Sequence, residues 1–252
     1  MLDLGPLFDT LWTTDLLWLY GFAVLTGLVR GFSGFGAAMV FIPLASILVP
    51  PQTAVITLWL IDVLVTSPLT IKGMRHGHWP EILPLFLGAM AGVPLGVWLL
   101  ATTPETPMRW TISIIVLLAV LVLASGYRRK NRMPLPGVLA VGASAGVGSG
   151  MASLGGPPVI VFWVSGAASA AQTRMNIFGF FGMTALMSGA GHYLFGLFTP
   201  ERLMLAALLI PAYALGIFSG NRMFGLASES MFRRFALTIC AAGAILVMPV
   251  WR

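Results

Sequence analysis

Ionisable side chains are scarce in this 252-residue chain, and one of them stands where a charge is hardest to tolerate. Asp62 lies in the run Leu-Trp-Leu-Ile-Asp-Val-Leu-Val, with apolar residues on both sides. Burying a carboxylate in such an apolar run costs free energy, so Asp62 is a candidate functional residue. We predict that Asp62 has a functional role, either coupling the protein's activity to an ion gradient or holding Arg174. The alternative is a structural buried acid, either protonated or paired with an arginine.

Two arginines lie within or beside the apolar runs. Arg174 precedes Asn176 by two residues, and Arg30 lies at the end of an earlier run. A guanidinium can hold a carboxylate or a sulfonate in a two-point fork. We therefore predict that Arg174 and Asn176 bind substrate, although Arg174 could instead reach out to the membrane interface. Arg30 could bind an anion in the same way, or it could simply lie at the inner end of a helix.

Two glycine-rich stretches interrupt long apolar runs. Gly lowers helix stability by about 1 kcal/mol and an interior Pro by about 3 kcal/mol, so these stretches are predicted breaks. Within a membrane the freed amides must face protein or water, and amides at a helix start attract anions. The alternative is that the glycines only pack helices together. The predicted binding residues at the two breaks are Ser33, Gly34, Phe35, Gly36, Ser153, Leu154, Gly155 and Gly156.

The composition of the chain indicates what kind of secondary structure carries these residues. The chain is 58% hydrophobic and 9% charged, with a mean hydropathy of +0.93. Soluble domains carry roughly 25% charged residues, so this is an integral membrane protein. We predict an all-α polytopic fold with eight to ten helical segments, because two of the ten apolar segments are short for a span. The segments are 12–29, 35–49, 54–71, 82–101, 108–127, 135–151, 156–169, 175–198, 203–220 and 234–250.

The two halves resemble one another. A shift of 114 positions places Gly34 on Gly148, Gly36 on Gly150 and Asp62 on Asn176. We therefore predict one membrane domain built from two repeats, 1–132 and 133–252. Five segments is an odd number, so the second repeat enters the membrane in the opposite direction. Basic residues at 128–132 predict the cytoplasmic side. An inverted repeat with glycine-broken helices is typical of secondary transporters.

Several other classes of function are disfavoured. The lone Cys240 excludes an internal disulfide, and three scattered histidines without carboxylate or thiolate neighbours predict no metal site. There is no Walker loop, no G-x-S-x-G and no H-E-x-x-H motif, so no enzyme activity and no cofactor are predicted. The net charge of +6 is interpreted as a topology signal rather than a nucleic-acid surface.

With these motifs in view, the chain resembles the sulfite exporter TauE/SafE family of bacterial membrane permeases. Residues 31–44 and 50–55 are similar to the first signature of that family, as is the His-Trp pair at 78–79. Residues 154–159, with Arg174 downstream, are similar to the second signature. One departure is that Gly34-Phe-Gly36-Ala-Ala stands in place of a triple glycine, which would alter the size of the pocket.

The resemblance implies transport of small sulfur-containing anions, such as sulfite, sulfoacetate or other organosulfonates, across the bacterial inner membrane. Coupling to a proton or Na⁺ gradient is expected, with the lipid bilayer as the other partner. We predict a secondary transporter that works by alternating access. The alternatives are an anion channel and a non-transporting membrane scaffold or assembly factor.

Overall fold

The computed structural model describes residues 14–125, 133–164, 169–223 and 229–249, and its regular structure there is entirely α-helical. Proline opens several of these helices, where its missing N–H costs no hydrogen bond: Pro51 begins α4 and Pro200 begins α10. The ten helices are α2 (Thr14–Ser33), α3 (Ala37–Ala45), α4 (Pro51–His76), α5 (Trp79–Thr102), α6 (Glu105–Ala124), α7 (Leu135–Ala152), α8 (Gly156–Val164), α9 (Ala170–Leu194), α10 (Pro200–Met223) and α11 (Glu229–Leu246).

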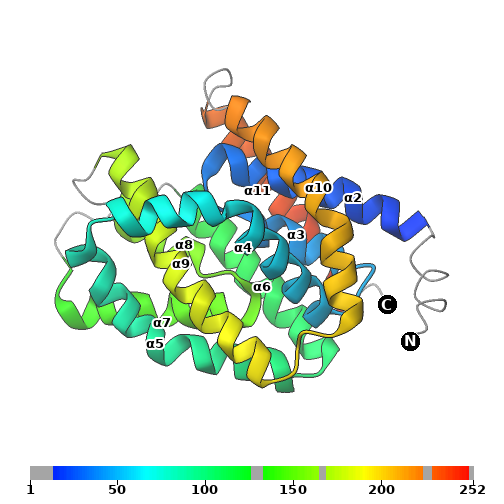
Figure 1. Cartoon of the computed structure of the whole chain (residues 1–252), viewed down its shortest axis with the longest axis horizontal. Helices are drawn as coiled ribbons and strands as arrows, with labels where there is room; N and C mark the ends of the chain where they lie inside the picture. Colours follow the sequence, from blue (N-terminus) through cyan, green and yellow to red (C-terminus); the bar gives the residue numbers. More distant parts are fainter. Residues whose placement is uncertain (1–13, 126–132, 165–168, 224–228, 250–252) are drawn as a thin grey trace.

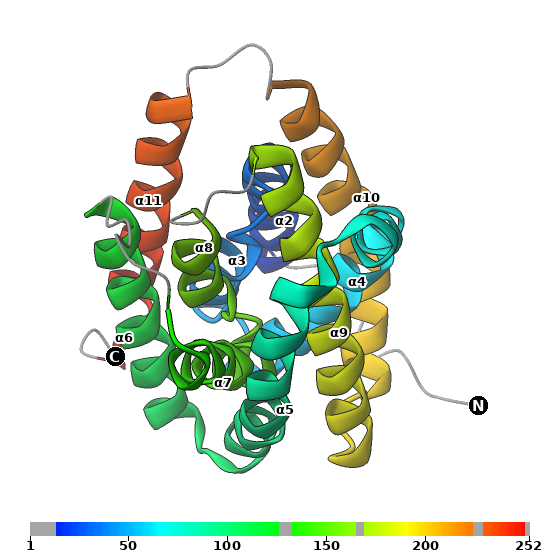
Figure 2. The same ribbon diagram turned by 90° about the vertical axis from the view of Figure 1, so that its left-hand side faces the viewer.

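Six of these helices are long and apolar enough to cross a membrane, namely α2, α4, α5, α6, α7 and α10. This confirms the predicted all-α polytopic membrane fold. The helices α3 and α8 have nine residues each, which gives a length of about 14 Å against a hydrocarbon core of roughly 30 Å. The prediction that the second and seventh segments are short is therefore confirmed. Figures 1 and 2 show both short helices in the interior, surrounded by longer ones.

The helix positions favour a register for the two halves that differs from the predicted one by five residues. The helices after the breaks begin at Ala37 and Gly156, which are 119 positions apart rather than 114. In this register Gly34 corresponds to Ser153, and both have left-handed backbone, with φ of 77° and 52°. Asp62 corresponds to Phe181 rather than to Asn176. Glycines recur so often in this chain that matching them by type alone fits more than one register.

Glycines spaced four residues apart hold two pairs of helices together. On α5, Gly88, Gly92 and Gly96 face α7, where a Cβ at each would overlap a backbone carbonyl. Gly27 and Gly31 of α2 face α10 in the same way. Such small residues let helix backbones approach closely within a membrane. Among the described helices, α2 and α7 come first in residues 1–132 and 133–252, and α5 and α10 come fourth. Each pair therefore joins the first described helix of one half to the fourth of the other.

Candidate functional site

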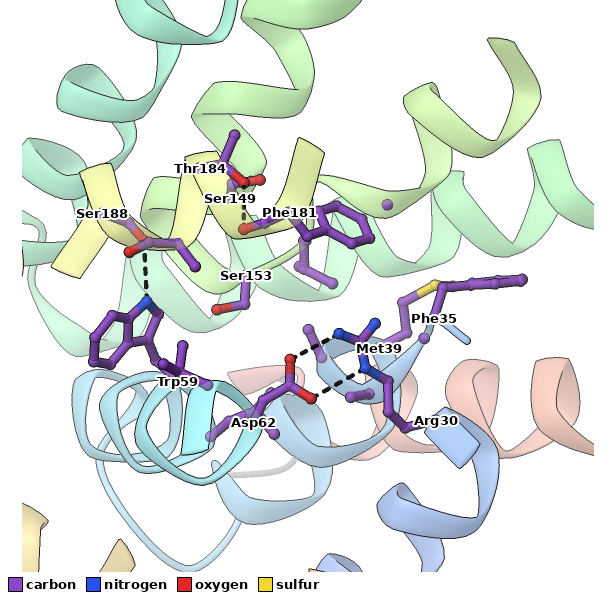
Figure 3. Close-up of a pocket in the computed structure, with 18 of the residues that line it drawn as sticks. Arg30, Phe35, Met39, Trp59, Asp62, Ser149, Ser153, Phe181, Thr184 and Ser188 are labelled. Atoms are coloured by element: carbon purple, nitrogen blue, oxygen red, sulfur yellow. Dashed lines mark hydrogen bonds and ion pairs between the residues drawn. The ribbon is translucent and has the colours of Figure 1, made fainter. Parts of the chain in front are cut away.

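A cavity of about 80 Å³ lies where the two broken helices meet. One water molecule needs roughly 10–15 Å³ on this scale, so the cavity holds several waters or a small solute. Its wall includes the first turns of α3 and α8, together with parts of α2, α4, α7 and α9, and Figure 3 shows the side chains that line it. The lining residues are Arg30, Phe35–Met39, Leu58, Trp59, Asp62, Val63, Ser149, Ser153, Leu154, Gly156, Pro157, Phe181, Thr184, Ala185 and Ser188.

An ion pair forms one side of the cavity. Arg30 Nε donates to Asp62 Oδ1 at 3.0 Å, and Arg30 Nη2 donates to Asp62 Oδ2 at 2.9 Å. The Tyr213 hydroxyl from α10 donates to Asp62 Oδ1 at 2.6 Å. The Arg30 side chain is 8% exposed and that of Asp62 is 24% exposed, so the carboxylate is the more accessible partner. This bidentate geometry, with its third donor, is what a charge pair needs when it is taken out of water.

The Arg30 guanidinium is also fixed on its other sides. Its Nη1 donates to the Gly34 carbonyl at 2.8 Å, and the Gly34 amide donates back to the Arg30 carbonyl at the same distance. The rings of Phe178 and Phe181 lie 5.7 and 5.8 Å from the guanidinium carbon, within cation–π range. The ion pair is thus attached directly to the backbone at the break after α2.

Hydroxyl groups from α7 and α9 line the opposite side (Figure 3). Ser188 accepts a hydrogen bond from Trp59 Nε1 at 3.1 Å, and its own hydroxyl donates to the Ala185 carbonyl at 3.2 Å. Thr184 donates to the Phe180 carbonyl of its own helix at 3.2 Å. Ser149 and Ser153 add two further hydroxyls. These neutral groups can turn a hydrogen towards an anion without adding charge.

The two helix starts at the cavity differ in what they can offer. The first turn of α3 contains Ala37, Ala38 and Met39, all of which carry an N–H that points back along the helix axis. α8 instead begins with Gly156, Pro157 and Pro158, and proline has no N–H. An anion would therefore find more amide donors at α3 than at α8.

Six of the predicted residues line the cavity, and they come from both halves of the chain: Phe35, Gly36, Asp62, Ser153, Leu154 and Gly156. Gly34 and Gly155 stand beside it and shape the breaks. A Cβ on Gly155 would overlap Ser149 Oγ, so this glycine allows α8 to fold back onto α7. Ser33 ends α2, and its side chain lies outside the described part of the structure.

Arg174 and Asn176 do not line the cavity, although Arg174 lies beside Gly34. Arg174 Nη2 donates to Asn221 Oδ1 at 3.4 Å, and its guanidinium carbon lies 5.7 Å from the centre of the Phe178 ring. Asn176 is fully buried, donates to Glu81 Oε2 at 3.1 Å and accepts from the His78 amide at 2.7 Å. It therefore ties α9 to the turn between α4 and α5. Asp62 pairs with Arg30 rather than with Arg174.

Several site residues were missed in the sequence. Arg30 was interpretable as a helix end, and Tyr213 gave no local signal, because it reaches Asp62 from 151 positions away. A usable signal existed on α9. Phe181, Thr184 and Ser188 recur at intervals of three and four residues, which places them on one helix face. Hydroxyls repeated along one face of an apolar helix indicate a polar wall.

Ser153 provides a test of strain at the second break. It is the one non-glycine residue with positive φ in the described part of the chain, and this conformation costs a residue with a Cβ roughly 1–2 kcal/mol. We expect Ser153→Gly to leave the free energy of unfolding unchanged or to raise it by up to about 1 kcal/mol. Ser153→Ala should bring no such gain, because it keeps the Cβ. Thermal unfolding in detergent measures the stability of both variants. A clear loss of stability in Ser153→Gly would contradict the inference that the Ser153 backbone is strained.

The family comparison covers almost the whole chain. A family model described as "Sulfite exporter TauE/SafE" matches residues 19–247, which include both breaks and every described residue of the cavity. No curated protein and no solved structure matches the chain. The family consists of membrane transporters, in agreement with six helices long enough to span a bilayer. This multi-pass membrane protein therefore belongs to the sulfite exporter TauE/SafE family.

Proposed function

We propose that this protein is a secondary transporter of small sulfur-containing anions across the bacterial inner membrane, with sulfite and organosulfonates as the substrate class. The substrate binds in the cavity between the two broken helices. The observation that carries the proposal is this cavity, because the first turns of α3 and α8 both line it and Arg30 forms part of its wall. Helix breaks that face a shared internal site are the arrangement expected of an alternating-access carrier.

The lining suits a small oxyanion with an apolar part. Arg30 supplies positive charge, the amides at the start of α3 supply partial positive charge, and the hydroxyls of Ser149 and Ser188 supply neutral donors. Phe35 and Phe181 form apolar surface beside them. Asp62 is the coupling residue, since it is the only carboxylate among the described residues that line the cavity.

Gly156 offers a variant that should fill the cavity without preventing folding. A Cβ at this position would lie 3.5 Å from Ile160 Cδ1 and 3.7 Å from Phe181 Cζ, which are ordinary contact distances. We expect Gly156→Val to fold and to lose anion binding, because its branches would occupy the space beside Phe181. Gly21→Val is the matched control, since a Cβ on Gly21 meets no atom within 4 Å.

Counterflow of labelled sulfite or sulfonate in proteoliposomes tests the proposal. Wild type and Gly21→Val should exchange external label for internal substrate, and Gly156→Val should not. Flux without counterflow would indicate an anion channel. A wild-type protein with neither flux nor a substrate-induced thermal shift would support a non-transporting scaffold.

The inverted repeat is the remaining part of the proposal, and labelling from the two sides of the membrane tests it. His78 follows α4 and Gly196 follows α9, the third helix of each half, and both positions are exposed. Opposite insertion of the halves places the ends of these helices on opposite sides. In a background with Cys240 replaced, we expect cysteines at 78 and 196 to react from opposite faces. Reaction from the same face would refute the inversion.

A further inference from the structure

We propose that Asp62 and the transported anion compete for Arg30, and that one proton taken up by Asp62 accompanies each anion. The inference rests on the proposed function and specifies its coupling. The cavity would then hold two ligands, an anion on Arg30 and a proton on the displaced carboxylate. Coupling would be a consequence of charge balance at a single guanidinium.

The charge of the cavity is balanced in this structure. Among the lining residues described, Arg30 is the one cation and Asp62 the one acid. A bound monoanion would leave these lining residues with one negative charge in excess, and uncompensated charge inside a membrane is strongly unfavourable. A proton on Asp62 restores neutrality.

The hydrogen bonds indicate which atoms take part. The Nε and Nη2 atoms of Arg30 form its two-point fork, and Asp62 now occupies it. An oxyanion gains that fork only when the carboxylate moves away. Asp62 Oδ1 also accepts from Tyr213, whereas Arg30 Nη2 is the described donor to Oδ2. A proton from water would therefore join Oδ2 as its bond to Arg30 breaks, while Tyr213 keeps hold of Oδ1. Tyr213 acts as a positioning residue.

Few other charged groups stand near enough to take over this role. α9 packs on α4 and carries Arg174, which lies beside Gly34, and His192, whose ring centre lies 5.7 Å from that of Trp59. α6 carries Glu105 and Arg109, which are 3.7 Å apart and pair with each other. α3 contains no ionisable side chain, and α10 contributes Tyr213. Asp62 is thus the acid placed to respond when an anion reaches Arg30.

The competition has a consequence for energetics. One anion and one proton crossing together carry no net charge, so a pH gradient drives transport and the membrane potential does not. By linkage, the anion must raise the affinity of the site for a proton as much as the proton raises its affinity for the anion. Net direction is then set by the pH difference together with the anion gradient.

Binding calorimetry of the purified full-length protein with methanesulfonate tests the inference. This probe stays ionised across the pH range in which proteins are stable, so any proton exchanged belongs to the protein. Titrations in buffers of different ionisation enthalpy give the number of protons bound. We expect roughly one proton per anion in wild type, and an affinity that falls roughly tenfold per pH unit wherever the free site is deprotonated and the complex is protonated.

Two variants test whether Asp62 is the group that takes up the proton. Asp62→Asn should bind methanesulfonate with no proton uptake and no pH dependence. Tyr213→Phe should bind more tightly than wild type at neutral pH, because the carboxylate leaves Arg30 more readily, and should still take up a proton. If Asp62→Asn does not fold, the wild-type proton number and the Tyr213→Phe affinity decide the matter.

The outcomes distinguish failure of the coupling from failure of the function. Wild-type binding without proton uptake, or with a requirement for Na⁺ over choline, overturns the inference and leaves the anion carrier standing. Proton uptake that persists in Asp62→Asn likewise overturns it. Failure of wild type to bind methanesulfonate, sulfite or any other sulfur anion would overturn the proposed function, and the inference with it.

Discussion

Replacing Arg30 with glutamine is expected to cause the largest loss of stability of any single substitution at the cavity. The change leaves the partly buried Asp62 carboxylate with Tyr213 as its remaining described partner. Removing one member of a buried ion pair typically costs about 3–5 kcal/mol, because the other charge is left uncompensated. Glutamine is also too short to make both fork contacts, so anion binding should be lost. Thermal unfolding in detergent measures the first effect, and binding calorimetry the second.

The double variant Arg30→Gln/Asp62→Asn separates charge from packing. It removes both members of the pair, so most of the lost stability should return, while anion binding should not. Lys72→Gln serves as a control for the loss of one positive charge, since Lys72 is exposed near the end of α4. A single Arg30→Gln variant as stable as wild type would show that Asp62 needs no cation in the folded state.

Local sequence was a good guide to the helices of this protein. The segment predicted at 54–71 extends over Pro51–His76, because the prediction stopped at the polar residues that carry α4 beyond its apolar part. Both short helices were anticipated, since Gly and Pro weaken a helix wherever they occur. These features depend on neighbours in the chain, which the sequence shows directly.

The centre of the site depends on contacts that no local pattern encodes. Arg30 and Asp62 are 32 positions apart, and Tyr213 arrives from the other half of the chain. Their meeting requires α2 to approach α10 closely, which Gly27 and Gly31 permit by leaving space for the Tyr213 and Ile217 carbonyls. The predicted register led to Asn176, which ties α9 to the α4–α5 turn instead.

The second large effect is expected from a single added methyl group at Gly92. This glycine lies in the middle of the α5–α7 contact, and a Cβ there would overlap the Ala143 carbonyl oxygen and lie 2.8 Å from the Val147 amide nitrogen. Overpacking usually costs about 1–3 kcal/mol, and the upper end or beyond applies here because the clashing atoms are backbone and cannot rotate away. Gly92→Ala should therefore lower the thermal stability sharply.

Gly21→Ala makes the same chemical change with the opposite expectation. A Cβ at Gly21 meets no atom within 4 Å, and alanine favours a helix by roughly 1 kcal/mol over glycine, so this variant should be as stable as wild type or more stable. The difference in midpoint between the two alanine variants, measured in one detergent, isolates the cost of separating α5 from α7. Because Ser149 lies on α7 and lines the cavity, Gly92→Ala protein that still folds should also bind anion more weakly. Equal stability of the two variants would show that α5 and α7 are not held by close backbone contact.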